Sequence, residues 1–155
     1  MCGICAFFDP ELKDKDCAIQ GMMDTIKHRG PSSNGKYIND KVALGFRRLS
    51  IIDIRCGSQP IFNEDKSRAI IFNGEIYNFK PLRKELIDAG HIFTTKADTE
   101  VLLHGYEEWG MDGLLKKVRG MFAFIIWDDN TKTLYGARDF FGIKPMYYSD
   151  QNGKL

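Results

Sequence analysis

The sequence predicts an α+β protein in which helices and antiparallel strands form separate layers. Strand-like segments come first along the chain, helical spacing dominates the middle, and strand-like segments return after residue 120. This order favours a layered α+β architecture over the strand–helix alternation of a parallel sheet. A length of 155 residues predicts one domain, and a hydrophobic content of 43% predicts a folded core.

The first half of the chain is expected to hold three strands and one helix. Strands are expected where apolar and β-forming residues gather, at residues 2–8, 36–39 and 42–54. Apolar residues recur at helical spacing over residues 17–28 and are followed by Gly30-Pro31, which predicts a helix that ends there. Residues 56–66 are predicted to form a loop.

The second half is expected to hold two helices followed by strands. One helix follows Asn78 as N-cap and ends at Gly90, and the other runs from about Asp98 to Gly110. Strands are expected at residues 69–72, 121–127, 133–137 and 146–148. The continuous apolar run 121–127 predicts a strand buried on both faces. Asn152-Gly153 is a hairpin signal with two residues after it, so the domain is expected to be incomplete at its C-terminal end.

Charge and hydropathy argue against several classes of function. The formal net charge is +1 with both signs interspersed, which is unlike a nucleic-acid-binding surface or a polybasic membrane patch. No apolar stretch approaches the ~20 residues of a membrane-spanning helix, and no secretory signal is present. A cytoplasmic protein that binds neither nucleic acid nor membrane is therefore expected.

The cysteines and histidines predict no metal centre. Cys2 and Cys5 form a Cys-x-x-Cys pair, a pattern that can indicate redox or metal chemistry. Residues three apart on a strand point to opposite faces, so we expect the two thiols not to act together. His28, His91 and His104 lack zinc-site spacing, and His104 is expected on a solvated helix face.

Cys2 is the most informative single residue. If Met1 is removed, Cys2 carries a thiol and a free α-amine on one Cα, and the amine has an ordinary pKa near ~7.7–8.0. A terminal amine can act as the base that activates its own side-chain nucleophile. The alternative is that Cys2 is a small buried hydrophobic residue, as most free cysteines are.

Asn73-Gly74-Glu75 is a candidate oxyanion hole, because it follows a predicted buried strand. An Asn amide and a Gly backbone N–H can both donate hydrogen bonds to a developing oxyanion. The alternative is a hairpin turn, although a predicted helix follows instead of a partner strand. The loop Gly57-Ser58-Gln59-Pro60 is only a weak indication of a lid.

Two charged positions are candidates for substrate binding. Arg47 and Arg48 adjoin in a predicted strand, so one of them should point to a covered face and need a carboxylate partner from the protein or a ligand. Asp98 is expected to cap a helix, but its carboxylate could equally bind a ligand ammonium. Arg138-Asp139 is expected to be a structural ion pair at a turn.

Seven motifs appear in an order that resembles a known family. They are CGI (2–4), HRGP (28–31), RRLSIID (47–53), FNGEIYN (72–78), DTE (98–100), GMFAF (120–124) and RDFFGIKP (138–145). Together they cover nearly the whole chain and resemble the N-terminal glutaminase domain of class II glutamine amidotransferases, of the asparagine synthetase type. One departure is Ser32-Ser33, because the family usually has Asp after HRGP.

The resemblance implies an N-terminal-nucleophile fold, a four-layer αββα sandwich of two antiparallel sheets flanked by helices. It implies a glutaminase domain over residues 2–155. In that family the residue matching Cys2 is the nucleophile that forms a γ-glutamyl thioester. The residue matching Arg48 holds the glutamine α-carboxylate. The resemblance also implies an oxyanion hole at Asn73 and Gly74, and binding of the substrate amino group by Glu75 and Asp98.

The resemblance also implies partners outside this chain. L-glutamine is the expected substrate, and the ammonia is expected to pass to an ATP- and Mg-using synthetase domain that this sequence lacks. No cofactor is expected in the glutaminase domain itself. An uncovered edge strand would favour association, so a homodimer is among the expected states. The alternative function is an inactive scaffold or binding module, which would follow if Met1 stayed on the chain.

Overall fold

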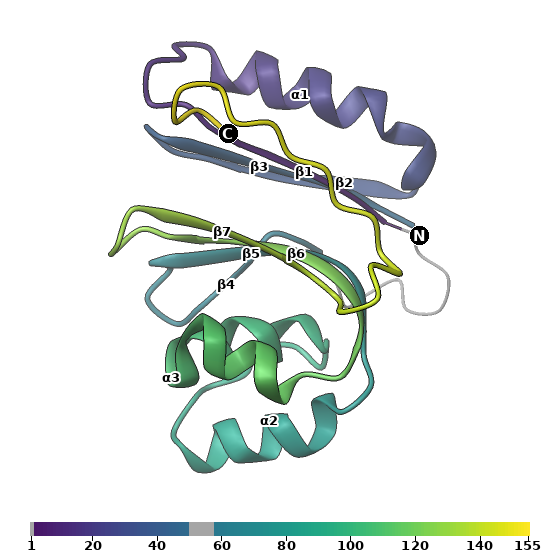
Figure 1. The fold of residues 1–155 in the computed structure, drawn as a ribbon, viewed down its shortest axis with the longest axis vertical. Helices are drawn as coiled ribbons and strands as arrows, with labels where there is room; N and C mark the ends of the chain where they lie inside the picture. The colour runs from purple at the N-terminus through teal and green to yellow at the C-terminus, as the bar shows by residue number, and fades with distance from the viewer. Residues whose placement is uncertain (1, 50–57) are drawn as a thin grey trace.

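Two antiparallel sheets lie face to face, with helices on both outer faces (Figure 1). The computed structural model describes residues 2–49 and 58–155. The helix α1 covers one sheet, and α2 and α3 cover the other (Figure 1). The predicted αββα sandwich is thereby confirmed.

The first sheet has the order β1-β3-β2, with β1 (Gly3–Phe8), β2 (Ser33–Ile38) and β3 (Val42–Arg48). Its helix α1 (Lys15–Thr25) begins at Asp14, whose side chain accepts a hydrogen bond from the Cys17 N–H. The short 3-10 helix η1 (Lys27–Arg29) follows α1, so the predicted helix 17–28 is shifted toward the N-terminus.

Alternation along the central strand β3 separates two packing layers. Val42, Leu44 and Phe46 belong to the core between the sheets, whereas Ala43 packs with Ile19 and Met23 of α1. The strand is therefore buried on both faces, as a central strand covered by a helix on one side and a sheet on the other should be.

The second sheet has the order β4-β5-β6-β7, with β4 (Ile61–Phe62), β5 (Arg68–Ile76), β6 (Gly120–Asp128) and β7 (Thr133–Arg138). Its outer face packs on α2 (Phe79–Asp88) and α3 (Thr99–Lys117) to form the larger core. In β6, Phe122, Phe124 and Ile126 face the helices, while Trp127 faces the other sheet. The prediction of a strand buried on both faces is confirmed.

Several predicted element boundaries are wrong. The strand predicted at 69–72 extends to Ile76, so Asn73-Gly74 lies inside β5 and not beyond its end. The helix α3 does not stop at Gly110, which forms a kink with φ 66° and ψ 177° before helical structure resumes. The loop predicted at 56–66 contains the short strand β4.

Other differences concern caps and ends. Asn78 occupies the cap position of α2, but its side chain donates to the Lys117 carbonyl at 2.9 Å and so ties α2 to the end of α3. Residues 146–148 form no strand. The strand predicted at 42–54 ends at Arg48, and residues 50–54 lie outside the described part of the chain.

The chain after β7 returns to the first sheet. Asn152-Gly153 forms the predicted tight turn, closed by a bridge between Gln151 and Lys154. Leu155 then exchanges two backbone hydrogen bonds with Phe8, at 2.9 and 3.1 Å. Within residues 2–49 and 58–155, no helix combines the length and apolar character that crossing a lipid bilayer requires.

Candidate active site

Cys2 lies directly before β1 and is half-buried against the core between the sheets. It shares this inner face with Ile4 and Ala6, because alternate residues of a strand point to the same side. Its thiol therefore points toward the layer between the sheets and not toward α1.

Cys5 lies on the opposite face, toward α1, where it packs with the α1 core. Burial raises the pKa of the Cys5 thiol to about 11, although the Arg47 charge lowers it in part. A thiol with that pKa is a poor nucleophile at neutral pH. Cys2, Cys5 and Cys17 are all free thiols, while Cys56 lies outside the described residues. The expectation that Cys2 and Cys5 do not act together is confirmed.

The two adjacent arginines separate to opposite faces, as predicted. Arg47 turns to α1, where its Nε donates to the Met23 carbonyl at 3.0 Å and its Nη2 pairs with Asp24. Arg48 is half-buried at the end of β3, on the inner face that the core residues of β3 share. Since Gly3 pairs with Arg47, the same register sets Cys2 opposite Arg48.

Close backbone packing supports this end of β3. A Cβ on Gly30 would lie 2.4 Å from the Arg47 carbonyl oxygen, so only glycine fits against the strand there. Two residues later, the Ser32 N–H donates to the Arg48 carbonyl at 3.0 Å. The HRGP segment thus holds the backbone that presents Arg48.

Asn73 is buried within β5 and opposes Ala123 of β6. It continues the face of Ala69 and Ile71, which belong to the core between the sheets. Gly74 follows on the other face, where a Cβ would lie 2.2 Å from the Met121 carbonyl oxygen. The hairpin-turn alternative for Asn73-Gly74 is wrong, because the pair sits in the middle of a β-ladder.

The candidate site residues lie at one end of the sandwich. Figure 1 shows the N-terminus and the end of β5 that leads into α2 on one side of the two sheets. Alternation puts Cys2 and Arg48 on the inner face of one sheet, and Asn73 and Glu75 on the inner face of the other.

Asp98 is tied to β5 rather than to its own helix. Its Oδ2 accepts a hydrogen bond from the Ile76 N–H at 2.8 Å, and its side chain makes no capping bond to α3. Burial raises the pKa of Asp98 above its ordinary value, and the neighbouring Glu75 charge raises it further. The expected capping role is wrong, and the two carboxylates form an acidic pair that a cation would stabilise.

Gln59 is a positioning residue that the sequence indicates only as part of a possible lid loop. Its side-chain amide bonds both backbone groups of Phe72, with Nε2 donating at 3.2 Å and Oε1 accepting at 2.6 Å. Its own backbone packs against Gly35, where a Cβ would lie 2.0 Å from the Gln59 oxygen. In the predicted lid loop, Gln59 is therefore held in place beside Phe72, which precedes Asn73.

Asp139 builds a turn beside β6. Its carboxylate accepts backbone hydrogen bonds from Phe122, Ile143 and Lys144 at 2.8–3.1 Å, a role different from the expected ion pair with Arg138.

Among the described residues, the one cluster of metal-ligating side chains lies elsewhere, in the layer that holds α3. It includes His104, which is 1% exposed, so the prediction of a solvated His104 is wrong.

Comparison with known proteins identifies the family of the chain. Residues 1–155 match the family described as "Glutamine amidotransferase domain". Glutamine-hydrolysing asparagine synthetase 1 of Bacillus subtilis is 48% identical over all of this chain and 25% of its own length. Asparagine synthetase 2 of Arabidopsis thaliana is 41% identical over 95% of this chain and 25% of its own length. The chain thus spans about a quarter of the length of these relatives.

Among solved structures, glutamine phosphoribosylpyrophosphate amidotransferase of B. subtilis matches 59% of this chain and 22% of its own, at 27% identity and a TM-score of 0.47. The match to the family profile covers the whole chain and includes every motif described above. The chain belongs to the glutamine amidotransferase domain family.

Proposed function

We propose that the chain hydrolyses the side-chain amide of L-glutamine to glutamate and ammonia, with Cys2 as the nucleophile. The observation that carries this proposal is that Cys2 and Arg48, on one sheet, and Asn73, on the other, lie on the inner faces of the two sheets at one end of the sandwich. A thiol, a cationic fork and an amide donor are the groups needed to attack an amide, hold a carboxylate and stabilise an oxyanion.

The proposed reaction runs through two steps. The Cys2 α-amine, freed by removal of Met1, takes the thiol proton as sulfur attacks the amide carbon. Asn73 and the Gly74 N–H stabilise the oxyanion, and the C–N bond breaks as the amine returns a proton to the leaving ammonia. Water then cleaves the γ-glutamyl thioester, which releases glutamate and restores the thiol.

Substrate recognition is proposed to use opposite charges at the two ends of glutamine. Arg48 would pair with the α-carboxylate, for which its planar fork is suited. Glu75 and Asp98 would pair with the α-ammonium. The raised pKa of Asp98 supports this assignment, because a bound cation would offset the burial and the Glu75 charge that disfavour the ionised carboxylate.

The ammonia acceptor is proposed to be an ATP- and Mg-dependent synthetase partner that makes an amide such as asparagine. This rests on the relatives, which are named as glutamine-hydrolysing asparagine synthetases and are about four times longer than this chain. We propose no cofactor or metal in the glutaminase reaction itself.

The test is to measure glutamate and ammonia release from glutamine for the protein and for three variants. Cys2→Ala should abolish turnover. Cys17→Ser, at an exposed position of α1, and Cys5→Ala, on the other face of β1, should retain it. An electrophilic diazoketone analogue of glutamine should add one adduct, at Cys2, seen by intact mass.

Two results would overturn this proposal. Turnover that persists in Cys2→Ala would remove Cys2 as the nucleophile. Retained Met1 with no adduct and no turnover would favour the alternative of a binding or scaffold module, because the α-amine would stay in a peptide bond.

A further inference from the structure

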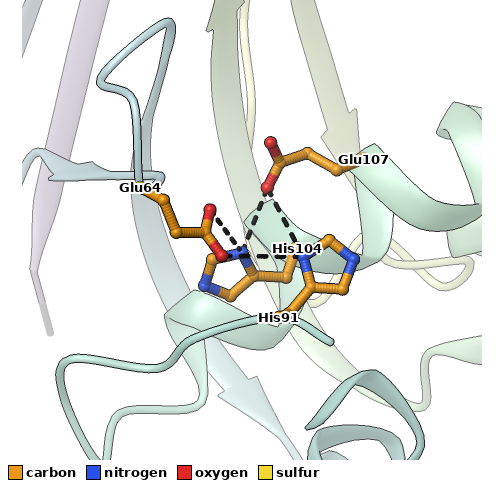
Figure 2. A group of neighbouring side chains, drawn as sticks. All are labelled: Glu64, His91, His104 and Glu107. Carbon is orange, nitrogen blue, oxygen red and sulfur yellow. Dashed lines mark hydrogen bonds and ion pairs between the residues drawn. The ribbon is translucent and has the colours of Figure 1, made fainter. Parts of the chain in front are cut away.

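Four ligand-type side chains converge in the helical layer of the second sheet (Figure 2). His104 and Glu107 project from α3, His91 comes from the connection between α2 and α3, and Glu64 comes from the turn between β4 and β5. One donor atom from each lies within 4.8 Å of the others. Segments far apart in sequence thus bring two imidazoles and two carboxylates to one point.

The nitrogen atoms that face the centre are the Nδ1 atoms of both histidines. His104 Nδ1 lies 3.0 Å from Glu107 Oε2 and 3.7 Å from Glu64 Oε2. His91 Nδ1 lies 3.8 Å from Glu64 Oε1 and 4.0 Å from Glu107 Oε2. Each imidazole therefore aims the same ring atom at both carboxylates.

Glu107 is held from behind by two donors. Its Oε1 accepts from Asn63 Nδ2 at 2.7 Å and from Arg68 Nη1 at 2.9 Å, which leaves Oε2 to face the histidines. Arg68 is itself fixed by Asp128 at 2.9 Å. Such outer contacts are what orient the ligands of a metal site.

The other ligands are oriented in the same way. Glu64 Oε1 accepts from the Ile92 N–H at 3.0 Å, and His91 Nε2 contacts Glu108 Oε2 at 3.3 Å on the side away from the centre. The His104 ring packs edge-on against Phe93, at 4.6 Å between centroids. These contacts leave the two Nδ1 atoms and one oxygen of each carboxylate directed at the centre, where a bound ion would replace the 3.0 Å hydrogen bond between His104 and Glu107.

The two carboxylates directed at the centre favour the binding of a cation there. Glu64, which is exposed, and Glu107, which is half-buried and paired with Arg68 from behind, point two carboxylates at one place, where a cation would offset their mutual repulsion. His104 is 1% exposed, and its Nε2 is buried with no hydrogen-bond partner.

We propose that Glu64, His91, His104 and Glu107 form a binding site for a divalent transition metal ion, and specifically for Zn²⁺. Imidazole nitrogen and carboxylate oxygen are ligands that Zn²⁺ takes, and four protein ligands make a closed, structural site. Donors at the corners of a tetrahedron around Zn²⁺, each at ~2.0–2.2 Å from the ion, lie about 3.3–3.6 Å apart. The donor atoms of the cluster lie within 4.8 Å of one another, so the widest pair needs to approach by roughly 1.2–1.5 Å on binding. Glu64, the most exposed of the four, lies on a turn that can supply this movement.

The proposed ion would act structurally, away from the Cys2 site. It would join the β4–β5 turn to the α2–α3 connection and to α3, which fixes the helical layer on the second sheet. The expected result is a protein whose thermal stability rises with Zn²⁺, independently of glutamine turnover.

The test is a Zn²⁺ titration of the full chain after chelator treatment and dialysis, with its thiols alkylated so that cysteines do not compete. We expect one bound equivalent and a rise in Tm. His91→Ala and Glu64→Gln should each weaken binding at least ~10-fold, since even outer contacts of metal sites have effects of this size. Both positions are partly exposed, so these variants should fold, whereas His104→Ala would remove a buried side chain from the fold.

The matched control is Glu85→Gln. It removes one carboxylate from the same helical layer, at an exposed pair with Lys117, and should bind Zn²⁺ like the parent. The proposal is overturned if the alkylated protein shows no saturable binding. It is also overturned if His91→Ala binds as well as Glu85→Gln, or if His91→Ala lowers Tm while Zn²⁺ changes neither protein, which would identify a metal-free ion-pair cluster.

Discussion

Asp98 has a carboxylate whose charge is disfavoured both by burial and by its neighbour Glu75. A hydrogen bond that this carboxylate accepts from the Ile76 N–H keeps it on β5 and beside the proposed substrate ammonium. Its contribution to binding therefore depends on its ionisation.

Asp98→Asn should raise the KM for glutamine by ~10–100-fold, the range expected when a bond to a charged group is lost. The kcat should change less, because Asp98 does not touch the reacting amide. Steady-state kinetics over a glutamine series measure both. An unchanged KM would remove Asp98 from substrate binding.

The acid side of the pH profile tests the same residue. Because the pKa of Asp98 is raised above 3.8, the carboxylate should become protonated and glutamine binding weaken at a higher pH than an ordinary Asp would give. In Asp98→Asn this acid limb of kcat/KM should be absent. A variant profile that matches the parent would argue that another group sets the limb.

Asp139 illustrates a structural carboxylate. Burial raises its pKa, but the N–H groups of Lys144, Ile143 and Phe122 lower it more, so the net pKa is below the ordinary value. A depressed pKa stabilises the fold above the unfolded-state pKa, and this stability is lost as pH falls through the folded-state pKa.

Asp139→Asn should therefore lower the free energy of unfolding at pH 7 by ~1–3 kcal/mol, since three backbone donors, two of them in buried bonds, lose a charged acceptor. The deficit should shrink as the pH falls below the ordinary Asp range. Urea unfolding at a series of pH values would show this. A deficit that is constant with pH would indicate packing rather than charge.

At the scale of elements, α3 is two helical segments joined at Gly110. This residue has φ 66° and ψ 177°, a backbone region that essentially only glycine occupies. The same residue type inside α1, at Gly21, is helical, exposed and surrounded by open space.

Gly110→Ala should destabilise the protein by ~1–3 kcal/mol through backbone strain, with no steric clash. Gly21→Ala should instead stabilise it by ~0.5–1 kcal/mol, because alanine favours a helix. Thermal melts of the two variants should thus shift in opposite directions. Equal shifts would mean that the kink carries no strain.

Elements also show where prediction from sequence succeeded. The strands of the core were found because alternation and continuous apolar runs reflect burial directly, as in β6. The sequence predicts a helix end at Gly110, where the structure has a kink, because both give the same glycine signal. The cap positions Asn78 and Asp98 were identified, but their side chains bond distant segments that no local pattern encodes.

At the scale of the whole molecule, the two sheets meet through a small core. Leu44 from one sheet and Ile71 from the other are both fully buried in it. Since this layer is shared, the two halves are expected to unfold in one cooperative transition.

Leu44→Ala and Ile71→Ala should each cost ~2–5 kcal/mol of stability, and the double variant should deviate from additivity because the residues share one cluster. Ile87→Ala, at a position 49% exposed, should cost much less. Chemical unfolding followed by Trp fluorescence and circular dichroism would test this. Separate transitions for the two probes would show that the sheets unfold independently.

The arrangement of the candidate site could be predicted only in part. The family motifs identified Cys2, Arg48, Asn73, Gly74, Glu75 and Asp98, and strand alternation predicted that Arg47 and Arg48 separate. The pairing of His91 with His104, with ring centroids 5.0 Å apart, could not be predicted, because it depends on how the α2–α3 connection folds back over α3.

The Gln59 amide occupies the place of a peptide group beside Phe72, continuing the edge where β4 pairs with β5. The Phe72 amide proton is consequently protected from solvent by a side chain, whereas its neighbours in β5 are protected by backbone ladders. Its hydrogen-exchange rate is thus a one-residue reporter. Fast exchange at Phe72 with slow exchange at Ile70 and Ile71 would record release of Gln59 while the sheet stays intact.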